Sequence, residues 1–266
     1  MFSIESMLSA LQNKVRNADP VRSLGLASMK LIRKVFQRYS ENARSKRRAI
    51  FREYFHIDKA TRILDLGSED GSNIANVLAG SSYDPSNVYI ADIDPAAVER
   101  GAERYGFQPV KLTENGLLPF DDNYFDIVYC SSVIEHVTVK KADVWTIVSG
   151  KEFQQKALNS QQRFADDIRR VGKYYFVQTP CRTFPIESHS WLPLVGMMPR
   201  GMQVRLIRFA DRFWVKKTIP DFYLLSVSEL KLMFPASMMV KEKSFGFTKS
   251  LMAVKTPKDQ GSNKIG

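Results

Sequence analysis

Short apolar runs alternate with helical patterns between about residues 60 and 180, and this alternation restricts the fold more than any other feature. The strand-like runs cover 62–66, 88–93, 109–112, 125–131 and 174–179. Apolar residues recur at helical spacing in the segments 73–78, 96–105 and 164–171. Strands that alternate with helices predict an α/β fold whose parallel strands are joined by right-handed crossovers. Two further runs, 238–243 and 250–255, lie too close together for a crossover, so we expect them to form an antiparallel hairpin.

The regions outside this alternation predict three additional parts. Residues 1–58 have helical spacing without a strand pattern, and we expect a basic N-terminal helical extension there. The main domain then covers 59–256, with 182–222 inserted between the fifth strand and the final helix as a lid or substrate segment. We expect the tail 257–266 to be disordered.

The chain has 39 Lys and Arg against 28 Asp and Glu, and the resulting net charge of +11 is concentrated locally. One basic stretch runs from Arg33 to Arg52 with Glu41 as its only acid, and a second runs from Arg200 to Lys217. Such stretches suit a phosphate-bearing substrate, nucleic acid or an anionic membrane surface. A solvated helix face explains them equally well, so the charge alone selects no partner.

The first chemical motif is the sequence DLGSEDG at 65–71, where a strand ends in an acid and a glycine-bearing turn leads into a helix. Glycine allows a backbone to approach a ligand closely, and a helix N-terminus offers unpaired N–H groups. The spacing differs from the dinucleotide fingerprint G-x-G-x-x-G, and Glu69 and Asp70 would repel a pyrophosphate. We therefore expect a positively charged ligand without phosphates.

The second motif is the acid Asp92, which follows the second strand. A carboxylate at this point of such a fold can accept hydrogen bonds from both hydroxyls of a ribose. Asp94 precedes Pro95 and is better explained as a helix N-cap. We predict that Asp92 binds ribose, with a capping or loop role as the alternative.

The third motif is LPFDDNYFDIV at 118–128, followed by SSVIEHV at 131–137. Together with DLGSEDG and Asp92, it makes the chain resemble the class I S-adenosylmethionine-dependent methyltransferases, in the broad small-molecule and glycan-type subgroup with DLGxxxG, LPF…FD and SSxxEH signatures. The resemblance covers about residues 60–180. It implies a Rossmann-like sheet of seven strands, mostly parallel with a C-terminal antiparallel hairpin, and S-adenosyl-L-methionine as the cofactor.

The resemblance also implies roles for individual residues. The methionine part of the cofactor would be held by Asp65, Gly67, Ser68 and Gly71. Asp92 would hold the ribose and Ile93 would lie against the adenine, while Glu114 and its neighbour Asn115 stand where the family often places an aspartate that reaches the adenine. Ser131 and Val133 would border the methyl group.

Methyl transfer is mainly a matter of alignment, and a general base is needed only when the acceptor is a weak nucleophile such as a hydroxyl. Of three histidines, His136 follows the fourth strand and His189 follows the fifth, with Glu187 two residues before it. We expect these three residues to be catalytic, with a structural role for His136 equally open. His56 has the setting of an ordinary surface histidine.

We expect no metal site, because the chain has no C-x-x-C motif and its histidines are scattered. Without a signal or membrane-spanning pattern, a cytoplasmic protein with Cys130 and Cys181 reduced is expected. The inserted segment predicts a basic amphipathic helix near 205–214 that could lie on an anionic membrane; a cap folded onto the domain is the alternative.

These features predict a methyltransferase, with O-methylation of a small-molecule, glycan or lipid-linked acceptor as the first hypothesis. A nucleic-acid methyltransferase is less favoured, because CSSV at 130–133 stands where amino-methylating nucleic-acid enzymes carry NPPY or DPPY. A non-catalytic adapter with the same fold is the third hypothesis.

Overall fold

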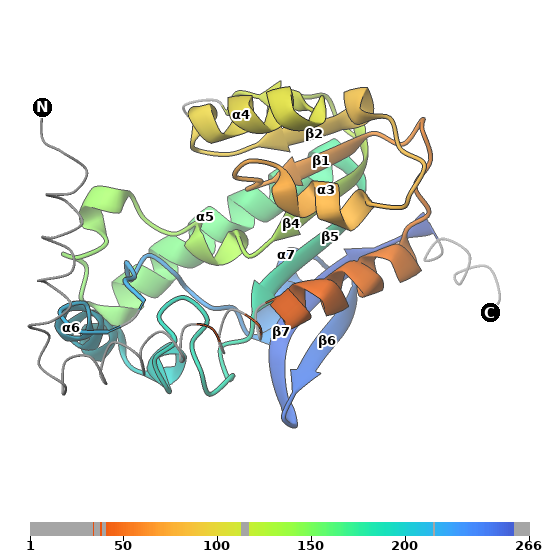
Figure 1. Ribbon diagram of the computed structural model, residues 1–266. Helices are drawn as coiled ribbons and strands as arrows, with labels where there is room; N and C mark the ends of the chain where they lie inside the picture. The colour runs from red at the N-terminus through yellow and green to blue at the C-terminus, as the bar shows by residue number, and fades with distance from the viewer. Residues whose placement is uncertain (1–33, 35–37, 39–40, 113–116, 215, 258–266) are drawn as a thin grey trace, which may run out of the picture. The chain divides into compact units, whose positions relative to one another are not determined.

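A computed structural model describes residues 34, 38, 41–112, 117–214 and 216–257 (Figure 1). The chain divides into two compact units, Met1–Arg47 and Arg48–Gly266. The second unit contains the sheet and all the residues discussed below. A helix over 41–54 runs across the division, and the predicted extension before residue 34 lies outside the described residues.

The second unit is built on one seven-stranded sheet with the order β3-β2-β1-β4-β5-β7-β6. Its strands are β1 (Ile63–Leu66), β2 (Val88–Ala91), β3 (Gln108–Val110), β4 (Phe125–Ser131), β5 (Gly172–Pro180), β6 (Met238–Ser244) and β7 (Phe247–Lys255). β1 to β5 pair parallel, while β7 pairs antiparallel with both β5 and β6. The predicted fold class, including the terminal hairpin, is confirmed.

Five helices of the second unit carry labels in Figure 1: α3 (Ser72–Leu78), α4 (Pro95–Tyr105), α5 (Gly150–Val171), α6 (Arg200–Ala210) and α7 (Val227–Met233). Asp94 caps α4 by accepting hydrogen bonds from the backbone of Ala96 and Ala97, as predicted. Ser226 and Glu229 form a capping box at the start of α7. A single 3₁₀ turn, η2 (Ile134–His136), follows β4.

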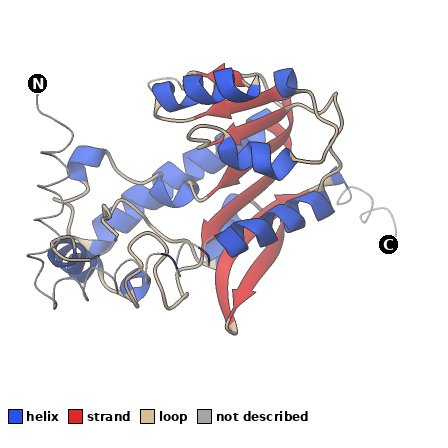
Figure 2. Ribbon diagram, viewed as in Figure 1, coloured by secondary structure: helices blue, strands red, loops and turns tan. Residues whose placement is uncertain are grey.

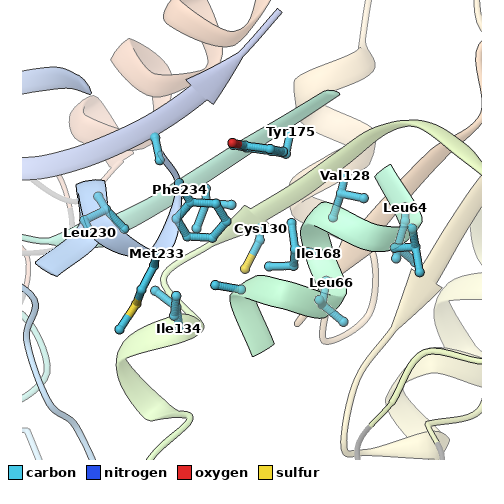
Figure 3. Packing of buried hydrophobic residues seen from close by; sticks show 14 of the residues in the cluster. Leu64, Leu66, Val128, Cys130, Ile134, Ile168, Tyr175, Leu230, Met233 and Phe234 are labelled. Carbon is cyan, nitrogen blue, oxygen red and sulfur yellow. The ribbon is translucent and has the colours of Figure 1, made fainter. Parts of the chain in front are cut away.

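The helices cover both faces of the sheet (Figure 2). On one face, α3, α4 and the helix end at Phe51 and Phe55 pack against Ile63, Ile90 and Ile127. On the other face, α5 and α7 pack against the opposite side chains of the same strands, and Figure 3 shows Phe234 and Ile168 on the two sides of Cys130. Because both faces are buried, the central strands β1, β2, β4 and β5 are mostly apolar, as parallel strands usually are.

Helix α5 is much longer than the 164–171 segment that the pattern indicated. Its first two turns bury Phe153 and Ala157, and its middle buries Gln161. The Gln161 amide donates to the carbonyls of Ile134 and Tyr223, so this polar residue belongs to the buried face. A small and a polar residue on that face weaken the hydrophobic periodicity on which the prediction depended.

The inserted segment 182–222 forms a small apolar cluster around α6. The cluster consists of Leu192, Val195, Ile207, Ala210, Phe222 and Leu224. Arg200, almost fully buried, ties the start of α6 to the segment before α5 and to Pro220 by donating to the carbonyls of Val144, Ile147 and Pro220. In the described part of the chain no helix combines the length and apolarity needed to cross a membrane.

Candidate functional site

The turn between β1 and α3 depends on Gly67 for a steric reason. Gly67 has φ of 80°, and a Cβ built on it would lie 2.1 Å from Cγ2 of Val133 in the loop after β4. The loops after β1 and β4 therefore touch at this glycine. The Gly67 and Ser68 backbone N–H groups both donate to the carbonyl of Ala91, which ties the turn to the end of β2. Gly71, with φ of 70°, occupies the left-handed position before α3.

Asp65, near the end of β1, is a buried acid with an unsatisfied carboxyl oxygen among the described residues. Only 2% of its surface is exposed, and its Oδ2 makes no hydrogen bond to any described residue. Burial, together with the charge of Asp92, raises the pKa of Asp65 to about 8. A buried carboxyl without a donor is costly. Asp65 is therefore suited to a cationic ligand that replaces the missing partner.

Asp92 closes the turn from the neighbouring strand end. Its Oδ2 accepts a hydrogen bond from the Glu69 backbone at 2.9 Å, and its Oδ1 accepts one from the Asp94 backbone at 3.0 Å. Each carboxylate oxygen keeps a second lone pair, so the side chain can still accept from a ligand. Ile93 is 73% exposed beside it. Glu69 adopts a positive φ of 50°, a strained conformation of the kind found at ligand-binding turns.

The loop after β4 brings a second polar group to the carboxyl edge of the sheet. Ser131 and Ser132 both donate to Oε1 of Gln178 on β5, at 2.7 and 3.0 Å. Ser132 has φ of 61°, again unusual for a residue with a side chain. The fully buried Nε2 of Gln178 has no hydrogen-bond partner within the residues that the structure describes. The turn after β1 and the loop after β4 meet where Gly67 faces Val133.

Two histidines meet beyond the ends of β4 and β5. The His136 and His189 rings stand edge to face with centroids 4.5 Å apart, although 52 residues separate them in the chain. Nδ1 of His136 lies 2.9 Å from Oδ1 of Asp221, and Nδ1 of His189 lies 2.6 Å from Oε1 of Glu187. The predicted set His136, His189 and Glu187 is thus brought together, and Asp221 joins it. Phe222 stacks on the His189 ring at 4.8 Å.

Glu135 belongs to the same cluster. This side chain is fully buried; its Oε2 accepts a hydrogen bond from Thr179, and its Oε1 lies 3.6 Å from Nε2 of His189. Burial would lower the pKa of His189, but its contacts with Glu135 and Glu187 outweigh burial and raise it to about 9. Burial would raise the pKa of Glu187, but the bonds and charge of His189 lower it to about 2. His189 is therefore held as a cation between two carboxylates.

The sequence analysis missed Glu135, Gln178 and Asp221. Glu135 stands inside the recognised SSVIEHV motif and could have been found there. No sequence pattern marked Gln178, which lies in an apolar strand, or Asp221, which lies in an irregular segment. The predicted residues Glu114 and Asn115 lie outside the described residues. Cys130 and Cys181 are buried free thiols, and burial raises the pKa of Cys130 well above its usual value.

Comparison with known proteins agrees with this geometry. Residues 64–150 match the family model described as a methyltransferase domain, and this segment runs from the second residue of β1 through β4 to the first residue of α5. This match supports a methyltransferase activity with S-adenosylmethionine as the cofactor.

Two solved structures show the extent of structural similarity. A SAM-dependent methyltransferase from Aquifex aeolicus shares 13% identity over 77% of this chain and 87% of that chain, with a TM-score of 0.42. A SAM-dependent methyltransferase from Methanosarcina mazei shares 12% identity over 78% and 97%, with a TM-score of 0.45. At these low scores neither structure bears on the site or the acceptor. No curated protein matched the chain.

Proposed function

We propose that S-adenosylmethionine binds at the carboxyl ends of β1, β2 and β4, and that its methyl group is transferred in line to an oxygen of a small-molecule, glycan or lipid-linked acceptor. The observation that carries the cofactor position is the unpartnered, buried Asp65. Its carboxylate would pair with the cationic methionine end of the ligand, next to the turn formed by Gly67, Ser68 and Gly71. Asp92 would accept from the ribose hydroxyls, and Ile93 would cover the adenine.

Ser131 and Val133 would border the transferred methyl group, because the loop that carries them packs against Gly67. Glu114 and Asn115 remain candidates for the adenine amino group on the resemblance alone. When the sulfonium loses its methyl group, its positive charge disappears, so a site that excludes water and holds the three reacting atoms in line supplies most of the acceleration.

We place the acceptor at the cluster of His136, His189 and Glu187. A hydroxyl is a weak nucleophile and must lose its proton during the transfer. The cluster would receive that proton at His136, because His189 is already held as a cation between Glu135 and Glu187. Glu187 orients the His189 ring, and Asp221 orients the His136 ring, whose side chain is 36% exposed and can meet a ligand. These contacts support an oxygen acceptor over a strongly nucleophilic one.

The inserted segment supports a lipid-linked acceptor. Within this segment, the part that follows α6 contacts the loop at His189, because Trp214 donates to the carbonyl of Ser190 and Lys216 donates to that of Ser188. On its outer side α6 and the following turn expose Met202, Phe209 and Phe213. Arginines 205, 208 and 212 are exposed in the same segment. A surface of apolar and basic side chains suits an anionic membrane.

Methyl transfer to fractionated cell extract tests the proposal. The protein is incubated with tritiated S-adenosylmethionine and either the organic or the aqueous fraction, with an Asp92→Ala variant as control. We expect label in a product that survives mild alkali, as a methyl ether does and a methyl ester does not. Label in the organic phase assigns a lipid-linked acceptor. An alkali-labile product, or equal labelling by the control, would contradict the proposal.

Vesicle co-sedimentation tests the membrane contact separately. We expect the protein to sediment with vesicles rich in phosphatidylglycerol and to remain in solution with neutral phosphatidylcholine. Phe209→Glu should reduce sedimentation, whereas Phe245→Glu, at an exposed phenylalanine of the β6–β7 turn, should leave it unchanged. Equal sedimentation of the two variants would refute a contact through α6.

A further inference from the structure

Three side chains with metal-binding atoms converge next to the end of β4: Glu135, His136 and His189. One donor atom of each lies within 4.8 Å of the other two. We propose that they bind a divalent transition-metal ion of the zinc class. Two histidines and one carboxylate provide three protein ligands and leave a fourth position open, which is the pattern of catalytic rather than structural zinc sites.

The state of Glu135 is the independent observation behind this proposal. Its side chain is fully buried, and Oε2 accepts from the Thr179 hydroxyl at 3.0 Å. Its Oε1 has no hydrogen-bond partner among the described residues and points toward Nε2 of His189 at 3.6 Å. A buried carboxylate oxygen without a donor is expensive in free energy. A cation between Glu135 and His189 would satisfy it.

Both histidines are already oriented in the way that metal ligands require. Metal-binding histidines nearly always give their other ring nitrogen to a carboxylate, a carbonyl or water, which fixes the ring and makes the ligating nitrogen more basic. Nδ1 of His136 is held by Asp221, and Nδ1 of His189 is held by Glu187. Nε2 of each ring can then face the ion, which at His189 would replace the proton that lies between this ring and Glu135.

The geometry requires a modest adjustment. Bonds of about 2 Å to a tetrahedral zinc ion put ligand atoms roughly 3.3 Å apart. The Glu135–His189 separation of 3.6 Å is close to this distance, while the largest separation in the set is at most 4.8 Å. A small shift of the partly exposed His136 side chain together with Asp221 would close the difference.

The charge of the cluster also suits a divalent cation. Three carboxylates, Glu135, Glu187 and Asp221, surround two imidazoles. Arg200 offsets part of this charge through its attraction to Asp221. An ion with two positive charges would compensate the remaining excess. The histidines lie far apart in sequence, which is why the sequence analysis expected no metal.

We rest the chemistry of this site on the proposed function. A hydroxyl bound at the open position of such an ion has a much lower pKa, so its proton passes to solvent near neutral pH. The oxygen then forms the new bond to the methyl carbon, the carbon–sulfur bond breaks, and the electron pair neutralises the sulfonium. The cofactor leaves as S-adenosylhomocysteine.

Calorimetry with zinc ion alone tests the site without any turnover. The full chain, stripped with a chelator, is titrated with Zn²⁺ in the absence of S-adenosylmethionine, and Mg²⁺ serves as the comparison ion. We expect one Zn²⁺ per chain and no measurable Mg²⁺ binding. Glu135→Gln, His136→Asn and His189→Asn should each weaken Zn²⁺ binding at least tenfold. Asp221→Asn should weaken it about 10- to 100-fold through the loss of ring orientation.

The matched control is His56→Asn, which removes the third histidine of the chain from an exposed position and should leave the affinity unchanged. Circular dichroism identifies variants that fail to fold. Because Glu135 is buried, Glu135→Gln is the variant most at risk of misfolding. If it does not fold, His136→Asn decides whether the cluster binds Zn²⁺. Absence of Zn²⁺ binding, or equal binding by His136→Asn and His56→Asn, would overturn the proposal. S-adenosylmethionine binding, measured on the same samples, reports the proposed function independently.

Discussion

The wild-type protein should release a proton when it binds its cofactor, and the Asp65→Asn variant should release none. Burial and the charge of Asp92 raise the pKa of Asp65 to about 8, so at pH 7 about nine-tenths of the free protein carries a protonated carboxyl. A cationic methionine group is bound best by the ionised form. Binding at pH 7 therefore releases close to one proton, and Asp65→Asn, which has no proton to lose, releases none.

The magnitude follows from the same pKa. Below pH 8 the apparent affinity should rise about tenfold per pH unit, since each unit changes the cost of ionising Asp65 by about 1.4 kcal/mol. Loss of the charged hydrogen bond should cost Asp65→Asn a further ~1.5–3 kcal/mol of binding free energy, a factor of roughly 10 to 150.

Calorimetry at pH 7 in two buffers of different ionisation enthalpy measures the released protons directly. Titrations at pH 6.0, 6.5 and 7.0 give the slope of affinity against pH, in a range where the amino group of the ligand stays charged. A wild-type protein that releases no proton, or an Asp65→Asn variant with the same slope, would refute the role given to Asp65.

Three further predictions concern the same residues. The pKa of Asp65 in the folded protein lies above its ordinary value of 3.8, so the folded protein holds a proton that the unfolded chain has lost, and stability falls as pH rises from about 4 through 8. Asp65→Asn should therefore melt at a higher temperature than wild type at pH 8.5. An equal melting temperature would count against a buried, unpaired carboxyl. Asp92→Ala should weaken S-adenosylmethionine binding by about 1–3 kcal/mol in calorimetry, and unchanged affinity would mean that another residue holds the ribose. Gly67→Ala should lower the free energy of unfolding by about 1–3 kcal/mol in urea, because the new Cβ meets Val133 and φ is positive; full stability would show that the two loops separate freely.

The sheet was predictable because each strand is a short apolar run that is visible in the local sequence. The apolar run 125–131 coincides with β4, and the short spacing between 238–243 and 250–255 permits only a hairpin. The places of the turn at 65–71 and of Asp92 were predictable for the same reason, since each directly follows a strand. That they bind a ligand stays a prediction. The role of Gly67 was only half predicted, because its contact with Val133 depends on how two loops pack.

The sequence predicted His136, His189 and Glu187 as candidate residues, but it did not predict how they contact one another. His136 and His189 approach each other because β4 and β5 are neighbours and the inserted segment folds back over their ends. Asp221 reaches His136 across 85 residues, and no local pattern encodes a contact of that separation. The long helix α5 was underestimated because Ala157 and Gln161 face the core.

A crystal structure of the chain with S-adenosylhomocysteine tests the central claim most directly. We expect the amino group of the ligand beside Asp65 and the ribose hydroxyls on Asp92. The sulfur should face the loop at Ser131 and Val133, with His136 and His189 beyond it. A nucleoside bound anywhere else, with Asp65 still lacking a partner, would contradict the account.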